Sequence, residues 1–463
     1  MSQDLGRDGA DRTGPADQAG PDDRPGAAPD DGLLTLTAGP VAHGGHVVAR
    51  VGDAPDGRVV FVRHALPGEV VRVRLTDAGE GRSFWRGEAV EVLEASPHRV
   101  QPPCPYAHPG GCGGCDLQHV ELTEQRRLKA AVVTEQLVRL GGVDPEQVLG
   151  GPVVVQALPE PGRAPGEETG LGWRTRVRYA VDRSGHPGFH RHRSHDVVPV
   201  TRCPQVTDAV DAVGVTRLPW PGVSGVQVSS GDDGAVVRAE HGPRRTRLPR
   251  VDALGLVGGT EDRPERVAGR TWVRHDVPGA GRLRVGVDGF WQAHATAAET
   301  FVAHVRRHAG VRPGDTVLDL YAGAGLFTVA LAGDLGDAGE LVAVESDRGA
   351  VADLRRNVHA APAVRVVHDR VERALRGSDV PAAADVVVLD PPRAGARSAV
   401  VSAVVARGPR AVVLVACDPA SLGRDTALLQ ERGYRLRALE AMDAFPMTHH
   451  VECVALFTPE APA

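Results

Sequence analysis

Cysteine is scarce in this chain, which has only six among its 463 residues. That number is far too small for a disulfide-stapled scaffold, so we expect reduced thiols. No apolar run is long enough to span a membrane, and the first residues, MSQDLGRDGADRTG, lack the apolar stretch of a signal peptide. These absences lead us to expect a cytoplasmic protein with no membrane partner.

Lysine is almost missing too. Among the 53 basic residues only Lys129 is a lysine, so any cationic surface consists of arginine, the better partner for phosphates and stacked bases. A GC-rich genome would produce the same bias. Residues 1–32 contain eight aspartates and three arginines, a net charge of −5 with little apolar material, which predicts a disordered acidic tail. Without this tail, acidic and basic residues nearly balance.

Residues 33–96 have the pattern of short alternating strands separated by glycine-rich turns, which predicts a small closed β-barrel. The segments GRVVFVRHALPGE and VVRVRLTD resemble the TRAM domain, an OB-like RNA-binding module found on RNA-modifying enzymes. The alternative is a barrel that only packs against its neighbour.

Residues 97–276 are less regular and rich in proline, glycine and arginine. Their one clear helix is LTEQRRLKAAVVTEQLVRLGG, with apolar residues at helical spacing and a Gly-Gly stop. In WRTRVRYAVDRSG, Arg174, Arg176 and Arg178 alternate with other residues and share one face of a strand. That face is a candidate for contacting RNA phosphates, or else a solvated polar face.

Residues 277–463 predict an α/β domain. Five apolar runs, TVLDL, ELVAVE, VRVVHD, DVVVLD and AVVLVAC, alternate with helix-like segments. This is the pattern of a doubly wound, Rossmann-like parallel sheet.

A ligand is expected at the carboxyl ends of these strands. The first run precedes AGAGLFTVALA, in which Gly323 and Gly325 predict a tight turn before a helix, and Glu345 ends the next run. A carboxylate there can accept two hydrogen bonds from a ribose diol, which predicts an adenosine-containing ligand. Thr328 stands where a dinucleotide fingerprint needs its third glycine, so S-adenosylmethionine is favoured over NAD.

Three cysteines, Cys104, Cys112 and Cys115, have the spacing C-x7-C-x2-C, and Cys203 offers a fourth thiolate. Such clustering in a cysteine-poor chain predicts a metal site in the central domain. Four thiolates suit zinc and an iron-sulfur cluster alike. The spacing differs from the C-x3-C-x2-C of radical enzymes, so we expect a structural site rather than a redox-active one.

The last two apolar runs place further reactive groups at the carboxyl ends of the predicted parallel strands. The fourth run ends in DPPR, from Asp390, where arginine replaces the aromatic residue of amine-specific methyltransferases. The fifth run ends in Cys417, and Glu452 lies in the strand-like segment VECVALF. A buried carboxyl group in an apolar strand is either paired or functional. His449 and His450 are candidates for orienting it.

Taken together, the four cysteines, DLYAGAGLFTVALA, DPPRAG, LVACDPASLGRD and FPMTHHVE resemble the RNA uracil-5 methyltransferase family from about residue 33 onward. The resemblance implies that Cys417 is the nucleophile, that Glu452 is the base and that the four cysteines hold a [4Fe-4S] cluster, with zinc as the alternative metal. Leu326 departs from familiar members, which have a polar asparagine there. The residues expected around the methyl donor are Gln292, Tyr321, Gly323, Glu345, Asp369 and Asp390.

The resemblance also implies a reaction. C5 of uracil is too weak a nucleophile to attack a sulfonium methyl group, so a thiolate first adds to C6, and a base later removes the C5 proton. The uridine must be unpaired or flipped. We expect a monomer that acts on ribosomal RNA, with 23S favoured and transfer RNA as the alternative. A non-catalytic RNA-binding protein and a methyltransferase for proteins or small molecules are the competing hypotheses.

Overall fold

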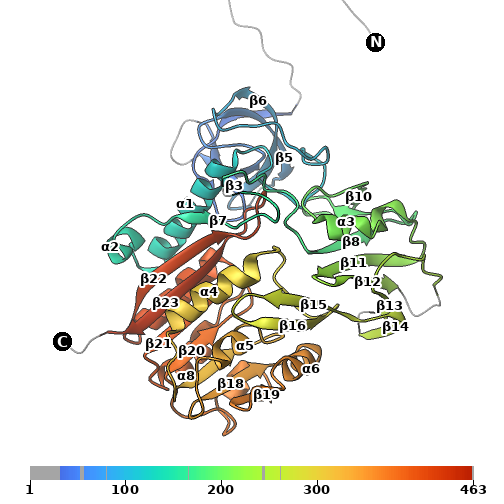
Figure 1. The fold of residues 1–463 in the computed structure, drawn as a ribbon. Helices are drawn as coiled ribbons and strands as arrows, with labels where there is room; N and C mark the ends of the chain where they lie inside the picture. The colour runs from blue at the N-terminus through green and yellow to red at the C-terminus, as the bar shows by residue number, and fades with distance from the viewer. Residues whose placement is uncertain are drawn as a thin grey trace, which may run out of the picture.

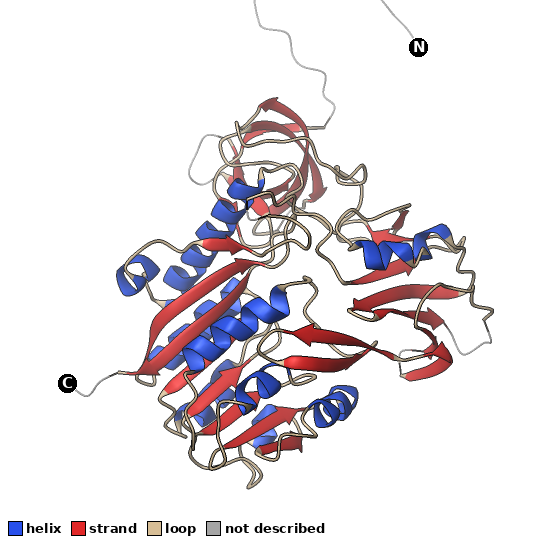
Figure 2. Cartoon of the chain, viewed as in Figure 1, coloured by secondary structure: helices blue, strands red, loops and turns tan. Residues whose placement is uncertain are grey.

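The described part of the computed structural model, residues 32–52, 57–79, 81–164, 166–241, 246–260 and 262–460, forms four β-sheets (Figure 1). A small barrel is followed along the chain by a mixed sheet, a hairpin and a large sheet flanked by helices (Figure 2). The predicted acidic tail lies outside these ranges apart from Gly32. No helix within them is long and apolar enough to cross a membrane.

The first sheet has the strand order β1-β5-β6-β4-β3-β2 and corresponds to the predicted barrel. Inward and outward residues alternate along its strands because side chains change face at every step. A hydrogen bond from the Gly39 N–H to the Val48 carbonyl ties the residue before β2 to β3. The strands are β1 (Leu34–Thr37), β2 (Val41–Ala42), β3 (His46–Val51), β4 (Arg58–Arg63), β5 (Val70–Asp77) and β6 (Trp85–Glu94).

The second sheet has seven strands in the order β10-β9-β8-β11-β12-β13-β14, and the hairpin β15-β16 follows it. Valines form most of its buried core, among them residues of β8, β11 and β12. The strands are β8 (Arg176–Val181), β9 (Pro187–His190), β10 (Val197–Pro199), β11 (Val223–Gly231), β12 (Gly234–His241), β13 (Gly255–Thr260), β14 (Arg263–Gly269), β15 (Trp272–Val277) and β16 (Gly281–Gly286). Short helices α3 (Asp208–Ala212) and η1 (Val215–Arg217) also belong to this region.

The large sheet has the order β19-β18-β17-β20-β21-β23-β22-β7. The five predicted apolar runs form its parallel strands, which are rich in β-branched residues and mostly buried on both faces. β23 pairs with β21 in the antiparallel direction. The strands are β7 (Val155–Ala157), β17 (Thr316–Leu320), β18 (Glu340–Glu345), β19 (Val364–His368), β20 (Val386–Leu389), β21 (Ala411–Ala416), β22 (Tyr434–Asp443) and β23 (Glu452–Pro459).

Two hydrophobic cores, one on each face, join this sheet to its helices. The core on one face includes residues of α4, α5 and α6, and the other includes residues of α1, α8 and α9. The predicted α/β sheet covered on both sides is therefore confirmed. The helices are α1 (Leu122–Gly141), α2 (Pro145–Leu149), α4 (Ala297–Ala309), α5 (Leu326–Ala332), α6 (Arg348–Asn357), α7 (Val371–Ala374), α8 (Arg397–Val405) and α9 (Pro419–Gln430).

Helix α1 and strand β7 come from the range predicted as the central domain, yet both pack on the large sheet. β7 pairs with β22 at the sheet's edge. α1 crosses α9 so closely that a Cβ atom at Gly423 would lie 2.5 Å from the Gln136 carbonyl oxygen. Glycine is thus required at this crossing.

Candidate active site

The end of the large sheet at which its parallel strands reach their carboxyl ends brings a thiol and a carboxyl group together. Cys417 directly follows β21, and Glu452 is the first residue of β23. The last backbone pair of these antiparallel strands joins Ala416 to Cys453, so Cys417 and Glu452 occupy the next opposed positions. Strand pairing alone therefore accounts for their proximity.

Acidic groups surround Cys417. Glu452 is buried, and burial followed by the charge of Asp390 raises its pKa well above the usual range, while Arg393 opposes this shift. Burial and then Asp319 raise the pKa of Asp390 to about 7. Burial first, then Glu452 and Asp390, raise the pKa of the Cys417 thiol to about 12. This excess of acidic groups favours a cationic ligand.

A pocket lies beside this acidic group, at the ends of β17 and β20. Tyr321 and Gly323 have φ angles of 66° and 56°, and Gly325 has 94°, so the chain turns sharply from β17 into α5. The tight turn predicted from the two glycines is therefore observed. The pocket is lined by Phe290, Trp291, Gln292, Tyr321, Ala322, Gly323, Ala324, Leu326, Phe327 and Asp390.

Glu345 is fixed next to this turn by backbone donors. The N–H of Gly323 donates to its Oε2 at 2.9 Å, and the N–H groups of Ser346 and Asp347 donate to Oε1 at 2.6 and 2.7 Å. Oε1 therefore has both lone pairs occupied, whereas Oε2 keeps a second lone pair for a ligand hydroxyl. The orientation of Glu345 is thus set before any ligand arrives.

Asp369 lies next to Glu345 but outside the pocket. Its N–H donates to the Glu345 carbonyl at 3.0 Å. Its carboxylate accepts from Nε of Arg373 at 2.6 Å, and this contact holds its pKa below the usual range. The pair lines a separate hollow together with Ser346 and His368. Asp369 therefore has a cationic partner already.

Asp319 is a buried acid beneath the pocket that the sequence analysis missed. Thr328, the residue in place of the third glycine, donates its hydroxyl to Oδ2 of Asp319 at 2.5 Å. Burial raises the pKa of Asp319 to about 6. Its Oδ1 has no hydrogen-bond partner in the described part of the chain. The acidic residue inside the apolar run TVLDL was the available signal.

The four predicted metal-binding cysteines come together, and all are free thiols. Each accepts an N–H group: Cys112 from the Gly114 backbone at 3.4 Å, Cys115 from Nε2 of Gln118 at 3.1 Å, and the other two from nearby backbone donors. Burial is the first cause that raises their pKa values, and neighbouring thiols contribute.

Comparison with known proteins identifies the family. A model described as tRNA (Uracil-5-)-methyltransferase matches residues 281–459, and a TRAM domain model matches residues 35–90. An "Uncharacterized RNA methyltransferase" of Streptomyces avermitilis is 45% identical over 91% of this chain and 97% of its own length. The 23S rRNA (uracil(1939)-C(5))-methyltransferase RlmD of Alkalilimnicola ehrlichii is 36% identical over 88% of this chain and 93% of its own. The chain belongs to the RNA uracil-5 methyltransferase family.

A solved structure agrees with this assignment at the level of the fold. The tRNA (uracil-54, C5)-methyltransferase of Pyrococcus abyssi, in complex with S-adenosyl-L-homocysteine, superposes with a TM-score of 0.65 and 20% identity, covering 92% of this chain and 100% of that one. The predicted α/β methyltransferase fold with an N-terminal TRAM barrel is confirmed. The chain is an S-adenosylmethionine-dependent RNA methyltransferase that acts at C5 of uracil.

In this RNA uracil-5 methyltransferase the loop that carries Cys104, Cys112 and Cys115, called the cysteine loop below, contacts the segment that precedes Glu452. Oδ2 of Asp116, next to Cys115, lies 2.6 Å from Nδ1 of His449, and its Oδ1 accepts from the buried Arg63 at 3.2 Å. From the other side, Lys129 forms a buried ion pair with Asp443 at 2.6 Å. These contacts anchor both ends of the segment that leads into Glu452.

Two sequence-based interpretations need correction. His449 bonds to Asp116, and no hydrogen bond within the described ranges joins His449 or His450 to Glu452, so the histidines do not orient that carboxyl group directly. Arg176 does not face solvent, since its guanidinium donates to the carbonyl of Val287 at 2.9 Å. Arg176 therefore holds the loop that precedes the pocket-lining residues 290–292.

Proposed function

We propose that this methyltransferase modifies a uridine of 23S rRNA through a covalent adduct, with Cys417 as the nucleophile and Glu452 as the base. The observation that carries the mechanism is the opposed position of the two residues on β21 and β23, beside a pocket suited to the methyl donor. Two relatives named 23S rRNA (uracil(1939)-C(5))-methyltransferase RlmD, at 36% and 33% identity, support the substrate.

The reaction requires that the Cys417 thiol loses its proton at the start and that C5 of the uracil loses its proton at the end. The Cys417 thiolate adds to C6 of the uracil, and electron density moves to C5. Bound S-adenosylmethionine supplies the methyl group that C5 takes up. Glu452 then removes the C5 proton, the C5–C6 double bond re-forms, and the thiolate leaves C6. The raised pKa of Glu452 makes it a stronger base than an exposed carboxylate.

The thiol must lose its proton before it attacks. In the ligand-free site burial, followed by the acidic neighbours Glu452 and Asp390, raises the Cys417 pKa to about 12, which protects the thiol from unproductive reactions. A cationic methyl donor in the pocket offsets those negative charges and lowers the pKa of the thiol. Binding of the donor thus prepares the nucleophile.

The donor pocket fits the residues predicted for it. Gln292, Tyr321, Gly323 and Asp390 line the pocket, and Asp390 places a carboxylate where a sulfonium group needs one. Oε2 of Glu345 offers its one free lone pair to a ribose hydroxyl. Asp369 reaches the adenine only if its contact with Arg373 rearranges.

We further propose that Cys104, Cys112, Cys115 and Cys203 hold a [4Fe-4S] cluster rather than zinc. Four thiolates suit zinc and an iron-sulfur cluster alike, and the resemblance of the four cysteines to the cluster ligands of the family favours the cluster. The N–H···S bonds also suit a cluster, because such donors stabilise its negative charge.

The first experiment traps the adduct. The Glu452→Gln variant is incubated with S-adenosylmethionine and total RNA, and covalent protein–RNA complexes are detected by mass spectrometry, with Cys417→Ala as the control. An adduct in the first variant that is absent from the second supports the mechanism, and sequencing of the RNA identifies the substrate. Trapped transfer RNA would overturn the ribosomal assignment, and absence of any adduct in folded, donor-binding protein would overturn the mechanism.

The second experiment identifies the metal. Anaerobically purified protein is analysed for iron, acid-labile sulfide and zinc, together with Cys112→Ser. Four irons and four sulfides per chain are expected in the wild type, because one cubane has that composition. One zinc and no sulfide would contradict the cluster.

A further inference from the structure

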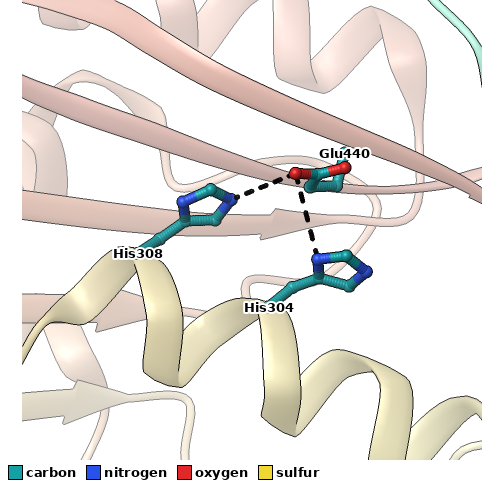
Figure 3. A group of neighbouring side chains, drawn as sticks. All are labelled: His304, His308 and Glu440. Atoms are coloured by element: carbon teal, nitrogen blue, oxygen red, sulfur yellow. Dashed lines mark ion pairs between the residues drawn. The ribbon is translucent and has the colours of Figure 1, made fainter.

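Two histidines of α4 and one glutamate of β22 form a second cluster of metal-ligating side chains, separate from the four cysteines (Figure 3). His304 and His308 are one helical turn apart, so they project from the same face of α4. Nδ1 of His304 lies 4.0 Å, and Nε2 of His308 lies 3.8 Å, from Oε1 of Glu440. All three ligand atoms lie within 4.8 Å of one another.

One of these atoms lacks a partner. The side chain of His308 is only 7% exposed, and its Nε2 makes no hydrogen bond within the described residues. A buried polar atom without a partner costs free energy unless a ligand occupies it.

A cation already occupies part of this cluster. Nη2 of Arg307 donates to Nδ1 of His304 at 2.8 Å and also to Oε1 of Glu440. The Arg307 side chain is 57% exposed, so it can swing into solvent at little cost. Nε2 of Gln156, in β7, holds the other oxygen of Glu440 at 3.1 Å and fixes its direction.

We propose that His304, His308 and Glu440 bind a divalent transition-metal ion such as zinc, which displaces the Arg307 guanidinium. Two imidazoles and a carboxylate are a common donor set for zinc, with water as the fourth ligand. Tetrahedral zinc places such donors about 3.4 Å apart, so small side-chain rotations suffice. The ion joins α4 to β22 and, through Gln156, to β7.

The site also lies close in sequence to functional segments. α4 follows the residues 290–292 that line the donor pocket, and β22 pairs with β23, which begins at Glu452. An ion that ties α4 to β22 therefore stabilises the frame that carries the donor pocket and the base. Its role is structural, because no catalytic group is among its ligands.

The test measures zinc binding to the full-length protein and to three variants. Glu440→Gln keeps the side-chain shape but removes the anionic donor, so bound zinc falls by one equivalent per chain. Arg307→Gln removes the competing guanidinium and tightens zinc binding by up to about fivefold, the factor that corresponds to one exposed ion pair. Arg306→Gln is the matched control, because Arg306 pairs with Asp334 instead, and it leaves zinc binding unchanged.

The four cysteines can also take up zinc, so the result is the difference between wild type and variant. Cobalt supplies a second readout: the spectrum of the wild type minus that of Glu440→Gln shows d–d bands without thiolate charge transfer. Equal zinc stoichiometry and equal cobalt spectra in these two proteins would overturn the proposal. Weaker zinc binding by Arg307→Gln, whose exposed site tolerates substitution, would overturn it independently.

Discussion

The end of the large sheet that carries Cys417 and Glu452 and the cysteine loop of this methyltransferase are built by different means. Cys417 and Glu452 follow regular strands, so backbone pairing fixes their relative position. The loop that holds Cys104, Cys112 and Cys115 contains no regular helix or strand, and its thiols are held by N–H···S bonds and by their own burial. A site built on strand register survives the loss of its ligand, whereas a loop site depends on the ion that joins its ligands.

The two regions meet at Asp116. This carboxylate stands directly after Cys115 and bonds to His449, three residues before Glu452. Its charge is favoured mainly by His449 and Arg63, which hold its pKa below the usual range despite burial. The position of the segment that precedes Glu452 is therefore tied to the integrity of the loop.

The largest effect on methyl transfer is expected when the Cys417 thiol is removed without a change in the fold. Cys417→Ala removes the proposed nucleophile, so methyl transfer to RNA falls by more than about a thousandfold. Cys453→Ala is the matched control, since that thiol is buried one residue beyond Glu452 on β23 and takes no part in the proposed reaction. Transfer of a radiolabelled methyl group measures both. Equal losses in the two variants would refute the nucleophile assignment.

The next effect breaks the link between the two regions. Asp116→Asn leaves Arg63, which is 4% exposed, without its second carboxylate and removes the charge that faces His449. We expect the free energy of unfolding to fall by about 3 kcal/mol, as for other broken buried pairs. Glu121→Gln, which breaks only the exposed contact with His98, costs less than about 1 kcal/mol.

Urea unfolding of both variants tests this prediction. A cost for Asp116→Asn as small as that for Glu121→Gln would mean that the loop and the segment that precedes Glu452 are held together by other contacts.

The difference between a site built on paired strands and a site built on a loop also explains how much of the fold and of the candidate site could be predicted from the sequence. The alternation of apolar runs predicts the parallel sheet, and each strand end then places Glu345, Asp390 and Cys417 along one edge. The pairing of Asp116 with His449 was not predictable, because it joins residues far apart in the chain through side chains alone. Arg176 was misinterpreted for a related reason: strand periodicity gives the face of a residue, but not whether another loop covers that face.

The pH dependence of donor binding tests whether the charge of Asp390 contributes to binding of the methyl donor. Asp390 has a pKa of about 7 in the ligand-free protein, so its carboxylate is largely protonated below pH 7. A sulfonium ligand binds the ionised form better, so affinity for S-adenosylmethionine rises with pH up to about 7, by at most about tenfold per pH unit, and then levels off. Titration calorimetry measures this slope, and Asp390→Asn removes it.

The free energy of unfolding depends on pH in the opposite direction to the affinity for the methyl donor. Because folding raises the Asp390 pKa from its ordinary value of 3.8, its contribution to the free energy of unfolding is present in acid and is lost as the pH rises to about 7. Donor binding should restore stability at pH 7 and above. Affinity that falls as the pH rises would show that Asp390 does not face the sulfonium group.

The smallest effect on the free energy of unfolding is expected at the contact between the barrel and Asp418, the residue after Cys417. Nε2 of His43 lies 2.8 Å from Oδ2 of Asp418, and the His43 side chain is 40% exposed, so His43→Ala lowers the free energy of unfolding by less than about 1 kcal/mol. Asp418→Ala costs about 1 kcal/mol more, because Oδ1 of Asp418 also caps α9 by accepting from the Ser421 N–H. Thermal unfolding of the two variants separates the contributions. Equal costs would mean that the cap contributes nothing and that Asp418 serves mainly to hold the barrel beside Cys417.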